Sequence, residues 1–243
     1  MEDIRLEGKA GHVGSVMTAV VVDGQNGKEY RLPTEHEIAA AAIGEDQIQA
    51  AFKDVPFGVP EEPTPKGGGS GAGRAFSVQG YGLMRWRDLF TSRQLVALGT
   101  FVSATRAARQ AMAIAGYPPE WIEGIGAYLA SINSRTADYM ACLCVWEKGA
   151  EEVKHVFMRW ALPVTWDFAE ANPLAPIERF FLGGITSAYR TLSGLLPGLS
   201  GGTAVPQVQN RSAVLPGAVG LDVVFTDPPY YDAIPYSDLM DFF

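Results

Sequence analysis

The chain contains 243 residues, of which 47% are hydrophobic and 19% are charged, as is ordinary for a soluble globular protein with a sizeable core. A formal net charge of −8 argues against nonspecific nucleic-acid binding by the whole surface. No apolar run approaches the length of a membrane span, and the amino end lacks the basic start and apolar stretch of a signal peptide.

Residues 1–55 are expected to form a β-hairpin followed by two short helices. The turn sequence Gly24-Gln25-Asn26-Gly27 between two β-branched or alternating runs is typical of a hairpin. Thr34 with Glu37 three residues later predicts a capping box at the start of a helix. The predicted strands cover 16–23 and 28–32, and the predicted helices cover 34–43 and 45–53.

Residues 56–75 are expected to form a flexible linker, because the stretch is rich first in proline and then in glycine. Its glycine run, Gly67–Gly71, has the composition of a phosphate-binding loop. No strand precedes this run and no Lys-Ser or Lys-Thr pair follows it, so the linker is the preferred interpretation.

Residues 76–200 are expected to be mainly helical. Apolar residues at helical spacing run from Thr91 to Ala115, and Pro118-Pro119 opens the next long helix. Two long helices joined by so short a turn are expected to pack antiparallel. The other predicted elements are a helix over 120–147, a strand over 154–159, and short helices over 162–171 and 187–195.

The cysteines and histidines do not suggest a catalytic or metal site. Cys142 and Cys144 stand two apart on a predicted helix and point to different faces, and no third cysteine completes a metal site. We therefore expect buried thiols in a reducing cytoplasm and no bound metal. The three histidines are scattered, and His155 is the one that merits inspection.

Six arginines between residues 74 and 109 share that stretch with one acidic residue, Asp88, and with interleaved aromatics. Basic and aromatic residues together suit phosphate contact and base stacking, so Arg85, Arg87 and Arg93 are candidate nucleic-acid contacts. The alternative is a solvated helix face whose arginines pair with the acidic amino-terminal third. Residues 1–62 hold twelve acidic and five basic side chains.

The most informative segment is Asp227-Pro228-Pro229-Tyr230, which follows the apolar run 222–226. This run predicts a buried strand, and an acidic residue at the carboxyl end of such a strand lies where open α/β sheets bind ligands. The prolines lack a backbone N–H, so the strand ends and the loop is stiff with unpaired carbonyls. Carboxylate, carbonyl and aromatic face together match an amino group on a flat heterocycle. A surface turn is the alternative, because Asp-Pro-Pro is also ordinary turn chemistry.

The segment resembles the Asp-Pro-Pro-Tyr signature of DNA methyltransferases that modify exocyclic amino nitrogens, on adenine or less often on cytosine. The stretch 223–243 is similar to the corresponding part of large prokaryotic DNA methylases, described as adenine-specific, that carry a domain of unknown function ahead of the methylase core. Further similar pieces are Tyr30–Thr34, Gly80–Trp86, Asp88–Gln94 and Trp166–Pro173.

The resemblance implies a role for each residue of the loop. The Asp227 carboxylate and the Pro228 carbonyl would accept the two amino hydrogens, and Tyr230 would stack on a base flipped out of the duplex. It also implies S-adenosyl-L-methionine as methyl donor, DNA and other subunits of a restriction-modification or phage-defence system as partners, and no membrane. The candidate site therefore consists of Asp227, Pro228, Pro229 and Tyr230 for catalysis. Its candidate substrate contacts are Tyr231 and Tyr236 next to the loop, and Arg85, Arg87 and Arg93 from the basic, aromatic-rich stretch.

The implied fold is α/β, with a partial Rossmann-like methyltransferase sheet in 201–243 and a large, mainly helical insertion ahead of it. Its predicted strands are 205–209 and 222–226, and Pro235 opens a final helix over 236–243. The glycine-rich Phe-x-Gly-x-Gly donor motif of this class is missing: Phe181–Ile185 has only its first glycine, and Gly124-Ile125-Gly126 lies inside a predicted helix. We therefore expect a middle fragment of a longer enzyme, inactive alone, whose donor site lies largely outside this chain.

Two other functional interpretations stay open. The chain could be a non-catalytic DNA- or protein-interaction module that retains the loop as a relic. It could also be an unrelated hydrolase or binding domain in which the Pro-Pro turn is only structural.

Overall fold

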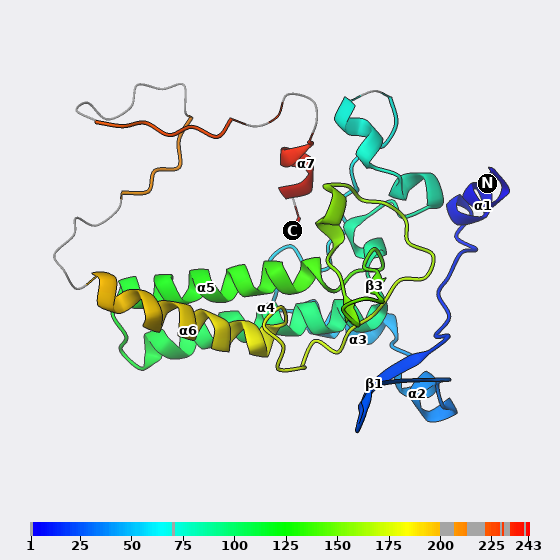
Figure 1. The fold of residues 1–243 in the computed structure, drawn as a ribbon, viewed down its shortest axis with the longest axis horizontal. Coiled ribbons are helices and arrows are strands. Elements are labelled where there is room, and N and C mark those ends of the chain that lie inside the picture. The colour runs from blue at the N-terminus through cyan, green and yellow to red at the C-terminus, as the bar shows by residue number, and fades with distance from the viewer. Residues whose placement is uncertain are drawn as a thin grey trace.

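The computed structural model describes residues 2–69, 71–199, 207–212, 222–228, 230, 234–240 and 242–243. Within them the fold is mixed α/β: helices dominate, and each of the two sheets has two antiparallel strands. Three long helices, α4, α5 and α6, lie side by side, with the amino-terminal hairpin at one end of the molecule (Figure 1). None of the helices in the described part of the chain is both long and apolar enough to cross a membrane.

The amino-terminal hairpin and its two helices are confirmed. Strands β1 (Val20–Gly24) and β2 (Gly27–Arg31) pair with Gly24 opposite Gly27, so Gln25 and Asn26 form the turn, and the first strand begins later than expected. Helix α2 (Glu35–Ala40) begins with the predicted capping box: Glu37 N–H donates to the Thr34 hydroxyl, and Thr34 N–H donates to the Glu37 carboxylate. Helix α3 (Glu45–Phe52) follows.

One helix was not anticipated. Helix α1 (Glu2–Lys9) packs against the short 3-10 helix η2 (Val78–Tyr81), a contact between segments far apart in sequence. A Cβ atom on Gly8 would overlap the Tyr81 carbonyl oxygen, so the close approach of the two backbones depends on glycine.

Part of the expected flexible linker is packed against the core. Thr64 N–H donates to the Met84 carbonyl, the Thr64 hydroxyl donates to the Leu83 carbonyl, and Trp86 N–H donates to the Glu62 carbonyl. Val59 and Thr64 are buried. The expectation of flexibility is wrong for residues 59–64, because one buried apolar side chain and backbone pairing to 83–87 hold them in place.

The long antiparallel helices are confirmed. Helix α4 (Ser92–Ile114) is capped by Thr91, whose hydroxyl accepts from Gln94 N–H, and it ends before Gly116 at φ +77°. Helix α5 (Pro119–Asp138) packs along α4, and α6 (Phe181–Leu199) packs along α5. Phe181 of α6 stacks on Phe101 of α4 with ring centroids 4.6 Å apart, so the three helices share one apolar layer.

Helix α5 ends at Asp138, well before the expected end at residue 147. The residues that follow, Met140, Ala141, Leu143 and Cys144, are all buried. A helix that packs on one side cannot bury so continuous a run, so the chain leaves the helix and enters the core as irregular backbone.

The region after α5 differs from expectation in three places. Strands β3 (Trp146–Glu147) and β4 (Glu152–Val153) form a small hairpin, and the predicted strand 154–159 is instead largely the 3-10 helix η4 (Val156–Arg159). The predicted helix over 162–171 is wrong: its first residue, Leu162, exchanges backbone hydrogen bonds with Ala75 and Ser77 rather than with its own segment. Helix α6 begins earlier than predicted and continues past Pro197 by two residues.

The carboxyl-terminal residues close the core. Helix α7 (Tyr236–Met240) covers the first part of the predicted final helix and buries Leu239. Phe242 and Phe243 then pack on Trp86 of the 3-10 helix η3 (Trp86–Leu89), with Phe90 and Phe157 completing the aromatic cluster. These contacts place the end of the described chain on the same core as η3 and α4.

Candidate functional site

The Asp227 loop lies at the surface. Asp227 and Pro228 are exposed, as is Tyr230, whereas Pro229 and Tyr231 lie outside the described residues. Asp227 has no hydrogen bond or ion pair with another residue in the part of the chain that the structure describes. Among the described residues, its carboxylate is therefore not engaged in a structural contact.

The run before the loop differs from the buried strand that the sequence predicts. Residues 222–226 form no strand within the described ranges, and Val223, Val224 and Phe225 are exposed, Phe225 at 93%. A strand needs a neighbour for its backbone hydrogen bonds and a covered face for its side chains, and the described part of the chain provides neither for residues 222–226. Burial of three such side chains would stabilise the folded protein by roughly 5–9 kcal/mol, and their exposure here means that this stabilisation is not obtained. Residues 207–209 of the other predicted strand, 205–209, are likewise exposed and unpaired, and its first two residues are outside the described set.

The loop is anchored on its carboxyl-terminal side. Tyr236, a candidate substrate contact, is half-buried at the start of α7. Beyond it, Phe242 stacks on Trp86 with ring centroids 5.2 Å apart. Trp86 stands between Arg85 and Arg87, so the fold brings the arginine-rich segment next to the segment that follows the loop. This relationship has little signal in the sequence: only the apolar character of residues 239–243 is typical of a segment that packs on a core.

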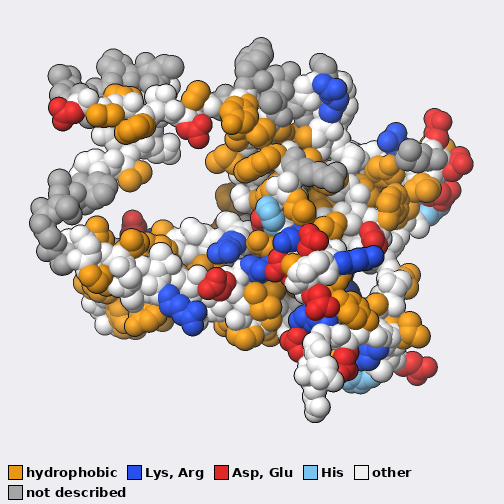
Figure 2. All heavy atoms as spheres, viewed as in Figure 1, with side chains coloured by type: hydrophobic (Ala, Val, Ile, Leu, Met, Phe, Trp, Pro, Cys, Tyr) orange, Lys and Arg blue, Asp and Glu red, His pale blue; other side chains and the backbone are white. Residues whose placement is uncertain are grey.

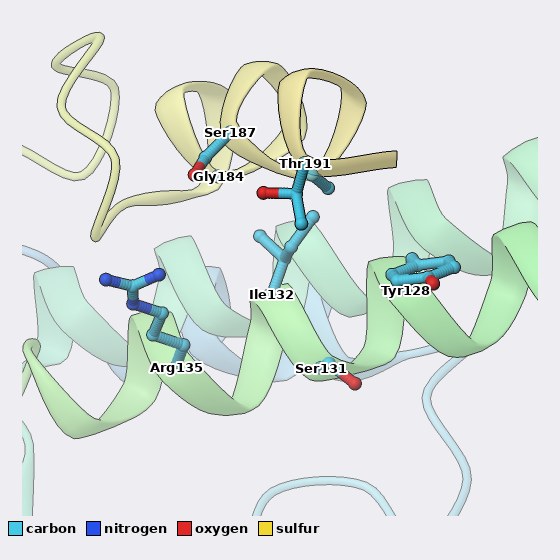
Figure 3. Close-up of a pocket in the computed structure, with 8 residues that line it drawn as sticks. Tyr128, Ser131, Ile132, Arg135, Gly184, Ser187 and Thr191 are labelled. Carbon is cyan, nitrogen blue, oxygen red and sulfur yellow. The ribbon is translucent and has the colours of Figure 1, made fainter. Parts of the chain in front are cut away.

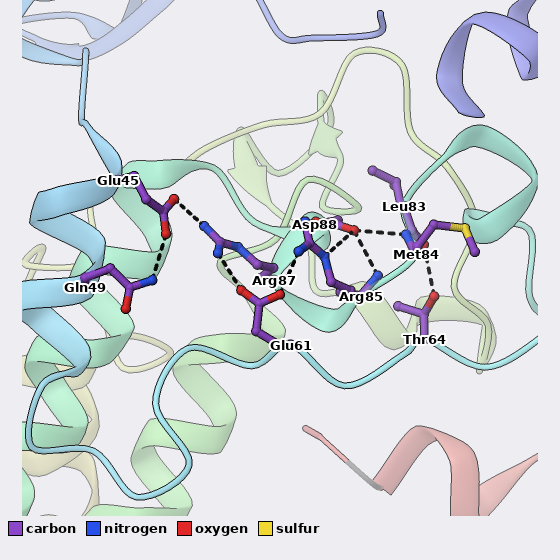
Figure 4. A network of polar contacts seen from close by, with 9 residues as sticks. All are labelled: Glu45, Gln49, Glu61, Thr64, Leu83, Met84, Arg85, Arg87 and Asp88. Atoms are coloured by element: carbon purple, nitrogen blue, oxygen red, sulfur yellow. Dashed lines mark hydrogen bonds and ion pairs between the residues drawn. The ribbon is translucent and has the colours of Figure 1, made fainter. Parts of the chain in front are cut away.

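The candidate arginines are bound to acidic residues of the chain itself. Arg85 Nη1 lies 2.7 Å from Glu61 Oε2, and Arg87 contacts Glu61 and Glu45 at 2.6 Å each (Figure 4). Arg87 is mostly buried, and its hydrogen bond lowers the pKa of the Glu45 carboxyl. Acidic and basic side chains are intermixed over this part of the surface (Figure 2). Arg85 and Arg87 thus pair with the acidic amino-terminal third, as the alternative interpretation describes.

Arg93 is also held by an acidic residue, but not one from the amino-terminal third. Its guanidinium donates to both carboxylate oxygens of Glu170 at 2.8 and 2.7 Å, and to the Ala41 carbonyl at 2.8 Å. The hydrogen bonds to Glu170 raise the pKa of Arg93. The bidentate pair joins the start of α4 to the irregular segment after η4, which is a structural use of the arginine.

A groove of about 220 Å³ lies between α5 and α6 (Figure 3). Arg135 and Tyr128 come from α5, and Ser187 and Thr191 come from α6. Arg135 is exposed and has no ion pair within the described residues. The lining holds no carboxylate, histidine or thiol, so the groove offers binding groups but no general base.

Asp138 and His155 form the other notable polar cluster. The Asp138 carboxylate accepts from Val156 N–H at 3.0 Å and from Phe157 N–H at 3.3 Å, and it lies 3.0 Å from His155 Nδ1. Burial raises the pKa of Asp138, and its contact with His155 opposes that shift. The Asp138 carboxylate caps the start of η4. His155 contacts this capping carboxylate, so a structural role accounts for its position.

Neither the thiols nor the metal-binding side chains form a reactive centre within the described residues. Cys142 and Cys144 are free, and burial raises the pKa of each to about 12, so thiolate is scarce near neutral pH. No group of three or more metal-binding side chains occurs in the ranges that the structure describes.

The described residues do not fit the methyl donor that the resemblance implies. Gly183 and Gly184 lie in the first turn of α6, where a Cβ on Gly183 would overlap the Ile177 carbonyl oxygen and one on Gly184 would meet Ile132. Both glycines therefore serve close packing and open no cradle for a ligand. Gly124 and Gly126 lie within α5, and Gly67 packs against the Phe76 backbone.

Comparison with known proteins gave no match: no protein-family model, no curated protein and no solved structure is significantly similar to this chain.

Proposed function

We propose that this chain carries the base-gripping loop of a DNA methyltransferase that acts on the exocyclic amino group of adenine or cytosine. The observation that carries the proposal is the exposed Asp227 carboxylate, which has no partner in the described residues and is followed by Pro228 and by the exposed ring of Tyr230. A structural turn of this composition would more commonly use the aspartate to bond its own backbone.

The chemistry follows from the amino group itself. An exocyclic NH2 is a double donor whose lone pair is delocalised into the ring, which makes it a weak nucleophile. Accepting its two hydrogens on the Asp227 carboxylate and the Pro228 carbonyl returns electron density to nitrogen. Tyr230 supplies a flat face for the flipped base, and positioning and charge provide most of the rate enhancement.

The exposed apolar run 223–225 supports a second element of the proposal, a sheet completed from outside the described residues. Val223, Val224 and Phe225 have the residue types of a buried strand but pair with no strand among the described residues. We propose that this run is one strand of a partial Rossmann-like methyltransferase sheet. The S-adenosyl-L-methionine site would then lie with the remaining strands of that sheet.

Donor binding tests this second element. Isothermal titration of the 243-residue chain with S-adenosyl-L-methionine is expected to give no binding tighter than a dissociation constant of about 10 µM, equivalent to roughly −7 kcal/mol. Tighter binding would place a donor site within this chain.

The catalytic role is tested by comparing Asp227→Ala with Asp222→Ala in the enzyme that contains this chain. Both aspartates are exposed and lie on the same segment, so the pair controls for loss of charge. Methyl transfer from labelled donor is expected to fall by at least about 100-fold, or about 3 kcal/mol, for Asp227→Ala and to change little for Asp222→Ala. DNA affinity is expected to be similar in both variants, because phosphate contacts supply most of it. Normal turnover of Asp227→Ala would identify the loop as a turn and end the methyltransferase proposal.

A further inference from the structure

The groove between α5 and α6 has one charged end and one aromatic end. Tyr128, Ile132 and Arg135 are spaced four and three residues apart on α5, so they share one face of that helix, and all three line the groove. Arg135 and Tyr128 lie on either side of Ile132, whose side chain points toward α6 (Figure 3). Seven residues of helix rise about 10 Å, which sets the separation of the two ends.

The polar groups of the groove are available to a ligand. Arg135 makes neither an ion pair nor a hydrogen bond with another described residue. The hydroxyls of Ser187 and Thr191, one turn apart on α6, likewise bond to no other residue in the described ranges. By contrast, the Ser131 hydroxyl donates to the Ala127 carbonyl at 3.0 Å. Guanidinium and hydroxyl groups donate hydrogen bonds, so together they suit an anion with oxygen acceptors.

The floor of the groove is apolar. Ile132 of α5 is buried and Ala188 of α6 is half-buried, and both line the groove between its two ends. The groove has a volume of about 220 Å³. Because an apolar cavity of about 150 Å³ holds one benzene molecule, this space accommodates a single ring with a short chain attached.

One cation beside an apolar floor selects the class of ligand. A nucleic-acid strand needs several basic residues along its backbone, and Arg135 is the only charged residue of the lining. Inorganic phosphate would contact the donors but leave the floor uncovered. Because Arg135 is exposed, water screens its ion pair with an anion, and that pair alone contributes little to affinity. The ligand therefore needs both an anionic group and an apolar body.

We propose that the groove between α5 and α6 binds a small carboxylate with an aromatic body. The carboxylate accepts two parallel N–H bonds from the Arg135 guanidinium, and the ring lies over Ile132 and reaches the Tyr128 ring. A ligand of about ten non-hydrogen atoms with one screened ion pair is expected to have a dissociation constant on the order of 1 mM. The site shares no residue with the Asp227 loop, so it is independent of the methyltransferase activity.

The test is a titration of the whole chain with 3-phenylpropanoate over about 0.1–10 mM, followed by the amide NMR shifts of the protein. Two further probes separate charge from body: 3-phenylpropanamide keeps the ring without the charge, and inorganic phosphate keeps the charge without the ring. Arg135→Gln removes the cation, and Tyr128→Ala removes the ring at the other end. The matched control is Arg106→Gln, at an exposed arginine of α4 that has no ion pair in the described chain and does not line the groove.

The wild-type chain and Arg106→Gln are expected to bind 3-phenylpropanoate alike, within about twofold, and Arg135→Gln at least about tenfold more weakly. Tyr128→Ala is expected to weaken binding by at least about threefold. The amide and phosphate are expected to bind the wild-type chain at least about tenfold more weakly than the carboxylate does. Far-ultraviolet circular dichroism checks that all the proteins are equally helical.

A wild-type chain that shows no saturation up to about 10 mM carboxylate overturns the proposal. Equal affinity for the amide would show that the Arg135 charge is not used, and equal affinity for phosphate would show that the apolar floor is not used; either result contradicts the proposed ligand. A loss in Arg106→Gln as large as that in Arg135→Gln would place the binding outside the groove and overturn it as well.

Discussion

Trp86 and Phe242 stack with ring centroids 5.2 Å apart and ring planes 14° from parallel, although 155 positions separate them in the sequence. Phe243 adds edge contacts to Trp86 and to Phe157 at 6.0 and 4.9 Å. Because Trp86 is 2% exposed, the residues that follow the Asp227 loop are attached to the interior of the helical region. The loop is thereby tethered on one side to a rigid support.

Replacing Trp86 by alanine is expected to destabilise the protein by about 3–5 kcal/mol, since it removes a large buried side chain and the platform for Phe242. Trp121→Ala is the control, because Trp121 is exposed on α5. Urea unfolding monitored by circular dichroism measures both. A loss of less than about 1 kcal/mol for Trp86→Ala would mean that the aromatic cluster is not part of the core.

Glu152 is expected to make the free energy of unfolding depend on pH in the acidic range. Its contacts with Arg179 and Lys154 lower the pKa of its carboxyl from 4.5 to about 2. A lowered pKa in the folded state adds stability above pH 4.5 that is lost as the pH falls from 4.5 toward 2. Glu152→Gln is expected to reduce the slope of unfolding free energy against pH within this window. Glu120→Gln, at an exposed site without an ion pair in the described chain, is expected to leave the slope nearly unchanged.

The cysteines are expected to react slowly with thiol reagents while the protein is folded. Burial raises the pKa of both thiols to about 12, and the thiolate is the reactive form. Titration with a chromogenic disulfide at pH 8 is expected to label both residues promptly in urea and at least about 100-fold more slowly in buffer. Prompt labelling of a single thiol in buffer would identify Cys142, the less buried of the two, as accessible.

Tyr230 is expected to contribute to capture of the flipped base through its ring rather than its hydroxyl. On the proposed function, Tyr230→Ala is expected to weaken productive substrate binding by about 1–3 kcal/mol in DNA methylation, and Tyr230→Phe by much less. Steady-state methylation at several DNA concentrations separates the Michaelis constant from the turnover number. Equal losses in both variants would point to the hydroxyl and contradict stacking.

The features that the sequence predicted well are those that neighbouring residues determine. The Gln25-Asn26 turn and the Thr34–Glu37 capping box require only a few adjacent residues, and both are present. The long helix ending before Gly116 is of the same kind, because glycine accepts the positive φ that ends it.

The features that it predicted poorly depend on residues far away in the chain. Helix α5 ends at Asp138 because the next residues pack into a core built from distant segments. Helical propensity depends on neighbouring residues and does not predict this packing. The acidic amino-terminal third correctly suggested partners for Arg87, but Glu170 as the partner of Arg93 had no local signal. For the candidate site, the Asp227 loop was proposed from its own residues, whereas its carboxyl-terminal anchor on Trp86 has no local signal. Residues 222–226 have the composition of a buried strand but no neighbouring strand within the described ranges.

The pairing of Thr64 with Met84 has a practical consequence for engineering the chain. It closes a loop of 19 residues, 65–83, whose exposed part includes Gly68 and Gly69, both at positive φ. Doubling the length of a flexible loop costs only about 0.6 kcal/mol, because the entropy of closure grows with the logarithm of length. A peptide tag inserted after Gly69 would therefore be tolerated, provided that Gly67, which packs against the Phe76 backbone, is kept.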